Sequence, residues 1–533
     1  MIIRRAVILA ALCATVVTGA QSPTPAPFDL EEATIAALQQ RMQSGQDTAH
    51  SLVVKYLARI EAVDRSGPTL HAVLELNPDA IAIADRLDAE RKTRGPRGPL
   101  HGIPILIKDN IATADGMMTT AGSLALAGSR PPRDAFIVTR LREAGAVILG
   151  KTNLSEWANF RSTHSTSGWS GRGGQTKNPY ALDRNPSGSS SGSGAAAAAS
   201  LAAATVGTET DGSIVSPSNN NGLVGIKPTL GLVSRSGIIP IAHSQDTAGP
   251  MARTVADAAA LLGAMSGADP DDAATKDAGR KGRRDYTASL DPNGLNGARI
   301  GVVRNKYFGY SPATDRIAEA AIAEMKLRGA TIVDPANIPT LGKFDETEFE
   351  VLLYEFKADL NKYLTWLGAA SPMHTLKDVI AYNDQHRDQE MPYFGQEIMA
   401  MAEKKGPLTS AKYTAALARN HRLSRSLGID AVMTRYTLDA LVAPTGGPAW
   451  LTDLVNGDSS AANAASPSTV TSVAGYPHIT VPAGFSRGLP VGISFFGRAW
   501  SEPTLIKLAY GYEQATKHRK APAFAPTADV SRR

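Results

Sequence analysis

Residues 185–217 read NPSGSSSGSGAAAAASLAAATVGTETDGSIVSP and anchor our interpretation of the rest of the chain. A turn rich in serine and glycine opens the stretch, a run of alanines follows from Ala195, and a second turn, residues 207–213, closes it. Alanine is the best helix former, and glycine lets the backbone approach a ligand closely. The pattern predicts a loop, a buried helix and a second loop, so that one rigid helix holds two serine-bearing turns.

Three other interpretations of this stretch compete with a catalytic one. Segments rich in serine and glycine are usually flexible linkers, and alanine runs are usually close-packed helix. A phosphate-binding loop requires a lysine after its last glycine, whereas Ala195 follows Gly194. Residues 188–192 fit the esterase pattern G-x-S-x-G, but residues 180–186 before them are polar and end in proline, where an esterase needs a strand.

A second motif lies far upstream, where residues 102–110 read GIPILIKDN. It alternates like a buried strand and ends on Lys108. Neighbouring residues of a strand point to opposite faces, so Asp109 need not face the lysine amine.

Lys108, Ser189 and Ser213, each in its own local setting, resemble the pattern of the amidase signature family. Three further stretches carry the similarity: residues 151–160 (KTNLSEWANF), 173–180 (GGQTKNPY) and 244–253 (SQDTAGPMAR). The resemblance covers the chain from about residue 28 to residue 518, and within the family it is strongest to the bacterial peptide amidases.

This resemblance implies a Ser-cisSer-Lys triad for amide hydrolysis. Ser213 would be the nucleophile, Lys108 the base, and Ser189 the serine that relays a proton between them from a cis peptide bond. An alcohol is a poor nucleophile and an amide a poor electrophile, so a base and oxyanion donors are both required.

The resemblance also implies residues that bind the oxyanion or the substrate. Thr210, Asp211 and Gly212, with Ser213 itself, match the family's oxyanion loop. Ser190 and Thr163 are further candidates for this part of the site, and we expect residues 153–183 to form part of the substrate cleft.

Lysine acts as a base only when it is uncharged, and its reference pKa is about 10.4. Burial without a facing carboxylate would lower the pKa of Lys108, whereas a facing Glu209 or Asp211 would raise it and defeat the scheme. The alternative that Lys108 is a salt-bridged structural residue stays open at this point.

Two positions depart from the family pattern. Many members carry arginine two residues after the nucleophile, where this chain has Val215, and many carry glycine where this chain has Ser187. The first departure leaves the class of substrate less determined than the type of reaction.

The N-terminus predicts export. Residues 1–20 combine two arginines with an apolar run that is too short to span a bilayer, as in a cleaved signal peptide. The single cysteine, Cys13, lies in this leader, so the mature chain would have no disulfide and no thiol nucleophile. We expect a periplasmic or secreted protein without a membrane anchor.

Length and composition favour one large α/β unit. The chain has 533 residues, is 43% hydrophobic, and carries a formal charge of +5 with no basic run interleaved with aromatics, which argues against nucleic acid as a partner.

Strand, helix and strand patterns alternate over residues 102–149, which indicates a mixed β-sheet core covered by helices on both faces. We also expect short strands at residues 224–227 and 237–241. The predicted organisation is a Pro-rich spacer (21–27), an amidase domain (28–518) with a polar excursion (266–297) and a helical lid (340–430), and a loose tail (519–533).

The sequence-based hypothesis is an amidohydrolase that cleaves a primary carboxamide to acid and ammonia, with C-terminal peptide amides as substrates. An aryl or fatty acyl amidase with the same triad, and an exported binding protein with a degenerate amidase scaffold, are the alternatives. No metal-binding motif is present, and we expect no cofactor, no metal and a monomeric protein.

Overall fold

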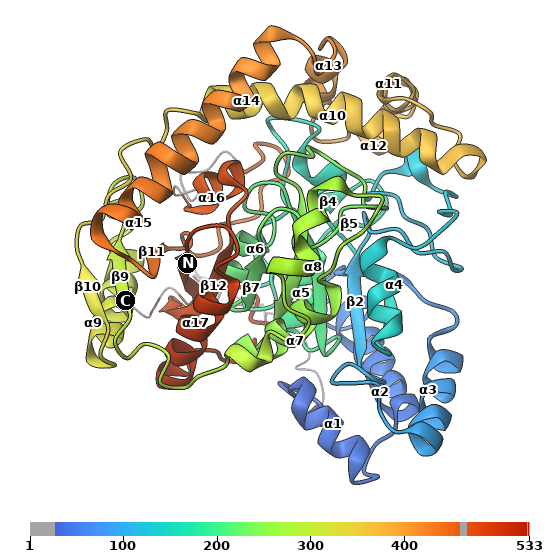
Figure 1. The fold of residues 1–533 in the computed structure, drawn as a ribbon. Helices are drawn as coiled ribbons and strands as arrows, with labels where there is room; N and C mark the ends of the chain where they lie inside the picture. The colour runs from blue at the N-terminus through green and yellow to red at the C-terminus, as the bar shows by residue number, and fades with distance from the viewer. Residues whose placement is uncertain (1–26, 459–465, 530, 532–533) are drawn as a thin grey trace, which may run out of the picture.

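The computed structural model describes residues 27–458, 466–529 and 531. Within these residues the core is a sheet of eleven strands in the order β1-β3-β2-β6-β8-β7-β12-β13-β11-β9-β10 (Figure 1). The strands of this sheet are β1 (Val73–Leu76), β2 (Pro104–Lys108), β3 (Val147–Thr152), β6 (Ala204–Glu209), β7 (Val224–Lys227), β8 (Thr247–Ala252), β9 (Arg299–Val302), β10 (Thr331–Val333), β11 (Ala440–Pro444), β12 (His478–Ser486) and β13 (Leu489–Phe496). The short β4 (Trp169–Ser170) and β5 (Gly174–Gln175) pair separately.

The sheet is mixed, as predicted. Strands β3, β2 and β6 are parallel to one another, and so are β11, β9 and β10 at the other end. Between them the pairs from β6 to β8, β7, β12, β13 and β11 are antiparallel. The candidate lysine therefore ends a strand that is buried between two parallel neighbours.

Helices surround this sheet (Figure 1). They are α1 (Ile35–Gln43), α2 (Ala49–Ile60), α3 (Ala80–Arg94), α4 (Phe136–Glu143), α5 (Ser191–Ala198), α6 (Val215–Asn220), α7 (Val255–Met265), α8 (Ala278–Lys281), α9 (Pro312–Leu327), α15 (Asp430–Tyr436), α16 (Ser468–Ala474) and α17 (Glu502–Thr516). Strand β11 shows that both faces are covered. Val442 belongs to the apolar core packed by α7, α9 and α17, whereas Leu441 and Ala443 belong to the cluster packed by α15 and α16. Alternate residues of one strand therefore meet different helical layers.

The predicted lid is helical. It contains α10 (Asp345–Leu367), α11 (Leu376–Gln385), α12 (Arg387–Glu390), α13 (Glu397–Glu403) and α14 (Ala411–Ser424). These helices arch over one end of the molecule, at the top of Figure 1. Phe356 and Leu360 of α10 pack in one apolar cluster with Trp157 and Phe160, which joins the lid to the predicted cleft segment.

The alanine-rich stretch is shorter as a helix than predicted. Helix α5 ends at Ala198, and residues 204–209 form strand β6. Thr205, Val206 and Thr208 are β-branched and lie between β2 and β8, where such side chains favour a strand. The two serine-bearing turns are therefore joined by helix α5 followed by strand β6.

The strand predicted at residues 237–241 is wrong. Only an isolated bridge between Ile111 and Ile238 forms there. Gly237 adopts a φ of +76°, and Pro240 has no N–H to donate to a sheet, so the segment forms a loop.

The prediction of a loose tail from residue 519 onward is wrong for its first residues. The Arg519 guanidinium donates to both carboxylate oxygens of Glu32 at 2.7 Å, and the N–H of Phe524 donates to the carbonyl of Pro179 at 3.0 Å. These contacts fasten residues 519–524 to the body of the fold.

The predicted leader lies outside the described residues, as does all but the last residue of the Pro-rich spacer. Among the residues that the structure describes, none of the helices has the length and apolar character needed to cross a membrane.

Candidate active site

The first serine turn lies at the N-terminal end of α5. The peptide bond between Gly188 and Ser189 is cis, in agreement with the expectation from the family. The carbonyl of Ser189 accepts a hydrogen bond from the N–H of Ser155 at 3.1 Å, and Ser189 is fully buried. The cleft segment therefore holds the backbone of this turn in place.

Lys108 lies at the end of β2, with its amine directed at hydroxyl groups. The Nζ atom is 2.8 Å from Ser189 Oγ, 3.0 Å from Ser190 Oγ and 2.9 Å from Thr208 Oγ1. The carbonyl oxygen of Thr208 lies 3.3 Å away. The structure thus brings together the predicted lysine and the predicted bridging serine in a hydrogen bond.

The surroundings favour the uncharged form of this lysine. Complete burial lowers the pKa of Lys108 to about 7, although the charges of Asp246 and Glu209 oppose the shift. Neither carboxylate forms an ion pair with the amine, because each is held elsewhere by hydrogen bonds from the backbone. Neither Glu209 nor Asp211 therefore pairs with the Lys108 amine, and such a pair is the contact that would prevent the lysine from acting as a base.

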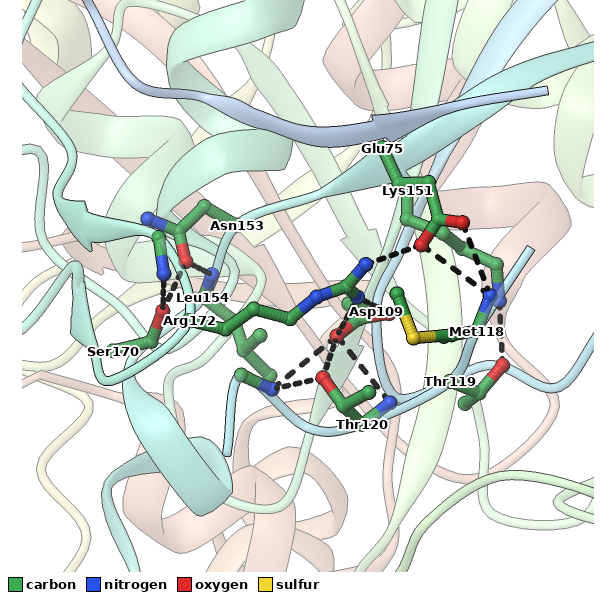
Figure 2. A network of polar contacts seen from close by, with 12 residues as sticks. Glu75, Asp109, Met118, Thr119, Thr120, Lys151, Asn153, Leu154, Ser170 and Arg172 are labelled. Carbon is green, nitrogen blue, oxygen red and sulfur yellow. Dashed lines mark hydrogen bonds and ion pairs between the residues drawn. The ribbon is translucent and has the colours of Figure 1, made fainter. Parts of the chain in front are cut away.

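Asp109 points away from the lysine amine, as the alternation of a strand predicts. Its carboxylate accepts from Thr120 Oγ1 and from the N–H of Gly122, and lies 3.4 Å from Arg172 (Figure 2). Arg172 also pairs with Glu75, and Lys151 donates to Thr119 Oγ1 at 2.7 Å in the same network. This network fixes the chain on the side of β2 opposite to Lys108.

The second serine turn follows β6. Gly212 adopts a φ of +79°, a left-handed conformation that suits glycine and turns the chain before Ser213. The N–H of Ser190 donates to the carbonyl of Ser213 at 3.2 Å, which ties the two turns together. Ser213 is 8% exposed, whereas Ser189 and Lys108 are fully buried. No hydrogen bond joins the hydroxyls of Ser213 and Ser189 among the described residues.

The predicted oxyanion loop is fastened through its side chains. Thr210 Oγ1 donates to Asp246 at 2.6 Å, and the Asp211 carboxylate accepts from Thr469 Oγ1 at 2.8 Å. Within the described part of the chain, the backbone N–H groups of Asp211, Gly212 and Ser213 donate to no other group. They are therefore available to an oxygen of a substrate.

Glu209 contacts the backbone at Val215, the position where many members of the family carry arginine. Its carboxylate accepts from the N–H groups of Ile214 at 2.7 Å and Val215 at 3.0 Å. Burial raises the pKa of Glu209, although the charge of Lys227 and these hydrogen bonds oppose the shift. Val215 itself is fully buried. In this chain, position 215 thus fills the core and offers no charge to a substrate.

A cavity of about 220 Å³ opens beside these residues. Thr208 and Thr210 form part of its inner wall, and the loop around Ile239, which the sequence predicts as a strand, forms a side. Tyr363 and Trp366 of α10 also line it, so the lid contributes to the cavity.

Two of the predicted site residues have contacts that the sequence does not predict. Ser190 Oγ is buried against Lys108 and the backbone of Thr208. Thr163 is bonded to Glu397 of α13 at 2.8 Å, so it joins the lid to the cleft segment. Side-chain direction depends on a backbone path that the sequence motif does not specify, and substrate contact by either residue stays a prediction.

Thr208 and Asp246 are the neighbours of the lysine and the oxyanion loop that the sequence analysis missed. Thr208 is aligned with Lys108 only through the pairing of β2 with β6, and Asp246 reaches Thr210 from the start of β8. Spacing along the chain contains no signal for either contact, because both depend on strand register.

One group among the described residues has the composition of a metal site: His243, Glu355 and Asp359. The two ring nitrogens of His243 face different carboxylates, Nδ1 at 2.8 Å from Asp359 and Nε2 at 3.5 Å from Glu355. Hydrogen bonding to Asp359 raises the pKa of His243 against the effect of burial. Each ring nitrogen of His243 therefore lies near a carboxylate of α10.

Comparison with known proteins agrees with this geometry. The family model described as Amidase matches residues 51–506. A protein of Arabidopsis thaliana described as a probable amidase is 44% identical over 523 residues, which are 96% of each chain. A subunit of the glutamyl-tRNA(Gln) amidotransferase of Chloroflexus aurantiacus is 38% identical over 504 residues, covering 93% of this chain and 99% of that one.

Solved structures extend the comparison. The peptide amidase of Stenotrophomonas maltophilia is 52% identical, with a TM-score of 0.88 over 93% of this chain and 100% of that chain. The fold, the match across most of the sequence and the arrangement of Lys108 beside Ser189 lead to one assignment. The chain belongs to the amidase signature family and is an amide hydrolase of the peptide amidase type of fold.

Proposed function

We propose that this protein hydrolyses the C-terminal amide of peptides to a free acid and ammonia, through an ester of the substrate acyl group with Ser213. The observation that carries the proposal is the 2.8 Å hydrogen bond between Lys108 and Ser189. Burial, which lowers the pKa of this lysine to about 7, supports its role as a base. A base with a pKa near the working pH is the most effective one.

In the first half of the reaction, Ser213 Oγ attacks the carbonyl carbon of the amide. Its proton passes to Ser189 Oγ while Ser189 gives its own proton to Lys108. The hydrogen bond between the two serines forms when the substrate is bound, since catalytic contacts often tighten only in the complex. The N–H groups of Asp211, Gly212 and Ser213 would stabilise the negative oxygen.

The lysine then returns the proton through Ser189 to the leaving nitrogen. The C–N bond breaks and ammonia departs. In the second half a water molecule attacks the ester, and its proton follows the same route to the Ser213 oxygen. The base is thus regenerated, and no cofactor is consumed.

The similarity to a peptide amidase supports a peptide amide as the substrate. The leader-like residues 1–20 support action outside the cytoplasm, in the periplasm or the medium. A second candidate is the same chemistry on aryl or fatty acyl amides, which is favoured by the apolar side chains of Ile238, Ile239 and Trp366 in the cavity.

The test is a panel of peptide amides, aryl amides and fatty acyl amides, with ammonia and free acid measured together. We expect the peptide amides to give the highest kcat/KM, and Ser213→Ala to abolish turnover. Ser424→Ala is a matched control, because Ser424 is fully buried and bonds only within α14. Undiminished turnover in Ser213→Ala would refute the mechanism, and a preference for the other amides would select the second candidate.

A further inference from the structure

The amine of Lys108 has more hydrogen-bonding neighbours than its role as a base requires. A neutral amine has two N–H groups and one lone pair. For the lone pair to take the proton of Ser189, both N–H groups must point away from Ser189, and hydrogen-bond acceptors on the other sides of the amine favour that orientation. The residues that bind these two N–H groups therefore matter for the proposed function, on which this inference rests.

Ser190 accounts for one N–H group. Its hydroxyl donates to the carbonyl of Thr208 at 3.0 Å and accepts from the N–H of Thr208 at 3.1 Å. Because its only hydrogen is used, Ser190 Oγ can face Lys108 at 3.0 Å solely as an acceptor.

The other N–H group faces Thr208, whose carbonyl oxygen lies 3.3 Å from Lys108 Nζ and whose hydroxyl is closer and less constrained by the backbone. Its hydroxyl oxygen lies 2.9 Å from Lys108 Nζ, and the residue is 7% exposed, towards the cavity. A hydroxyl can rotate, so Thr208 could either accept an N–H from the lysine or donate to its lone pair. The second arrangement would occupy the lone pair that Ser189 needs.

Asn110 lies on the other side of this hydroxyl. Its side-chain N–H donates to Thr208 Oγ1 at 2.9 Å. The Asn110 donor occupies one lone pair of Thr208 Oγ1 and so restricts the rotation of its hydroxyl. When Lys108 donates to the remaining lone pair, the hydrogen of Thr208 is directed at the cavity. We propose that Asn110 is a positioning residue that acts through Thr208 to direct the lone pair of Lys108 at Ser189.

The backbone holds Asn110 where this role requires it. Its carbonyl accepts from the N–H of Ile239 at 2.8 Å, and the side chain is 3% exposed. The preceding residue, Asp109, is held on the opposite side of the strand by Thr120 and Gly122. The backbone at Asn110 is therefore anchored by these contacts, and its side-chain N–H is directed at Thr208.

Charge allows the proposal to be tested through a pH profile. The ionisable groups that act on the Lys108 amine are Asp246 and Glu209, and both favour its charged form. Asn110→Asp would add a third carboxylate, one hydroxyl away from the amine, at nearly constant size. Asn110→Leu would remove the donor without adding charge.

The experiment measures kcat and KM on a peptide amide, and the rate at which a fluorophosphonate labels Ser213, across pH. For Asn110→Leu we expect kcat to fall about tenfold with KM within about twofold, the size expected for one lost buried hydrogen bond. For Asn110→Asp we expect the acid limb of both profiles to move up by about half a pH unit or more.

Asn77→Leu is the matched control. Asn77 is 4% exposed and donates to the carbonyl of Ile148 at 2.9 Å, away from the lysine. Its acid limb should equal that of the wild type. If Asn110→Leu does not fold, the near-isosteric Asn110→Asp variant decides.

Wild-type kcat and an unchanged acid limb in the folded Asn110 variants would overturn the inference alone. A wild-type protein that is not labelled at Ser213 would overturn the proposed function, and this inference with it. The labelling reaction thus separates the two failures, because it does not depend on the class of amide.

Discussion

Two buried lysines lie at the C-terminal parts of neighbouring parallel strands, Lys108 in β2 and Lys151 in β3, and their surroundings differ. Lys108 faces uncharged hydroxyls, and burial lowers its pKa to about 7. Lys151 belongs to the network that holds Asp109 and Glu75 (Figure 2). Burial lowers its pKa to about 8, although the charges of Asp109, Asp115 and Glu75 oppose the shift. Burial alone therefore does not make a lysine a base. The partners of the amine decide whether the lysine serves proton transfer or holds a network together.

The largest expected effect comes from exchanging each lysine for methionine. Lys108→Met should lower kcat about 10³-fold or more, within the range for loss of a general base. It should not lower Tm, because the unfolded lysine binds a proton below about pH 10.4 and the folded one only below about pH 7. Lys108 therefore disfavours folding fully below about pH 7 and progressively less as the pH rises to about 10.4, and the methionine variant is free of that cost.

Lys151→Met should show the opposite pattern. Removing Lys151 also relieves the cost of burying a charge, because burial lowers its pKa to about 8. It leaves the carbonyl of Ile111 and the hydroxyl of Thr119 without their donor, however, at a cost of about 1–3 kcal/mol, whereas Ser190 and Thr208 beside Lys108 keep other donors. Lys151→Met should therefore be less stable than Lys108→Met. Its kcat should stay within about tenfold of the wild type, since the network lies away from Ser189. Kinetic assays and thermal unfolding of both variants check the contrast, which would be broken by a Lys151→Met variant as inactive as Lys108→Met.

Ser190→Ala sharpens the account of the lysine pocket. Removing the hydroxyl that accepts from Lys108 should lower kcat about tenfold, the size of one buried hydrogen bond. Ser193→Ala, in the same turn of α5, removes a hydroxyl that bonds Thr152 and Val206 and makes no bond to the lysine. Steady-state kinetics should separate the two variants, and equal kcat values would mean that Ser190 has no part in orienting the amine.

The next effect is a shift in pH dependence. Activity should rise with pH through an acid limb near pH 7, as Lys108 loses its proton. Asp246 favours the charged lysine, so Asp246→Asn should move this limb to lower pH. Asp109→Asn should leave it in place, because Asp109 faces the Arg172 network. Profiles of kcat/KM measured across neutral pH test both variants, and a limb that moves only in Asp109→Asn would reverse the assignment of the two faces.

The smallest effect concerns stability. Arg172→Lys should lower the free energy of unfolding by about 1–2 kcal/mol, because lysine cannot bridge Glu75 and Asp109 as a planar guanidinium does. Arg133→Lys, at an exposed pair with Asp271, should change it by less than about 0.5 kcal/mol. Urea denaturation measures both. Equal losses in the two variants would show that the Arg172 network is no stronger than a surface pair.

Local patterns were enough to predict the parts of the fold that are encoded locally. The apolar alternation before Lys108 predicted β2, and the family resemblance predicted that Ser189 would lie next to this lysine, as it does. The strand at residues 204–209 was missed because Ala204 continues the helix-forming run of alanines before it, and pairing between β2 and β8 makes the segment a strand. The docking of the tail through Arg519 was missed because its partner, Glu32, lies at the other end of the chain.

The contact between Lys108 and Ser189 could be predicted from the sequence, and the residues that surround it could not. Thr208 and Asp246 reach the lysine and the oxyanion loop through strand pairing, which no spacing in the sequence reports. Ser190 follows Ser189 directly, yet its hydroxyl turns to the lysine, because the helix that begins at Ser191 sets its direction. Sequence motifs therefore identify the candidate reacting residues, whereas strand register determines which side chains surround them.

The most direct test of the central claim is the titration of Lys108 in the folded protein. Carbon-13 labelling at lysine Cε, with the signal assigned by its loss in Lys108→Met, follows the charge of the amine by NMR. The account predicts a midpoint near pH 7. A lysine that keeps its proton up to about pH 10, its value in water, would contradict it.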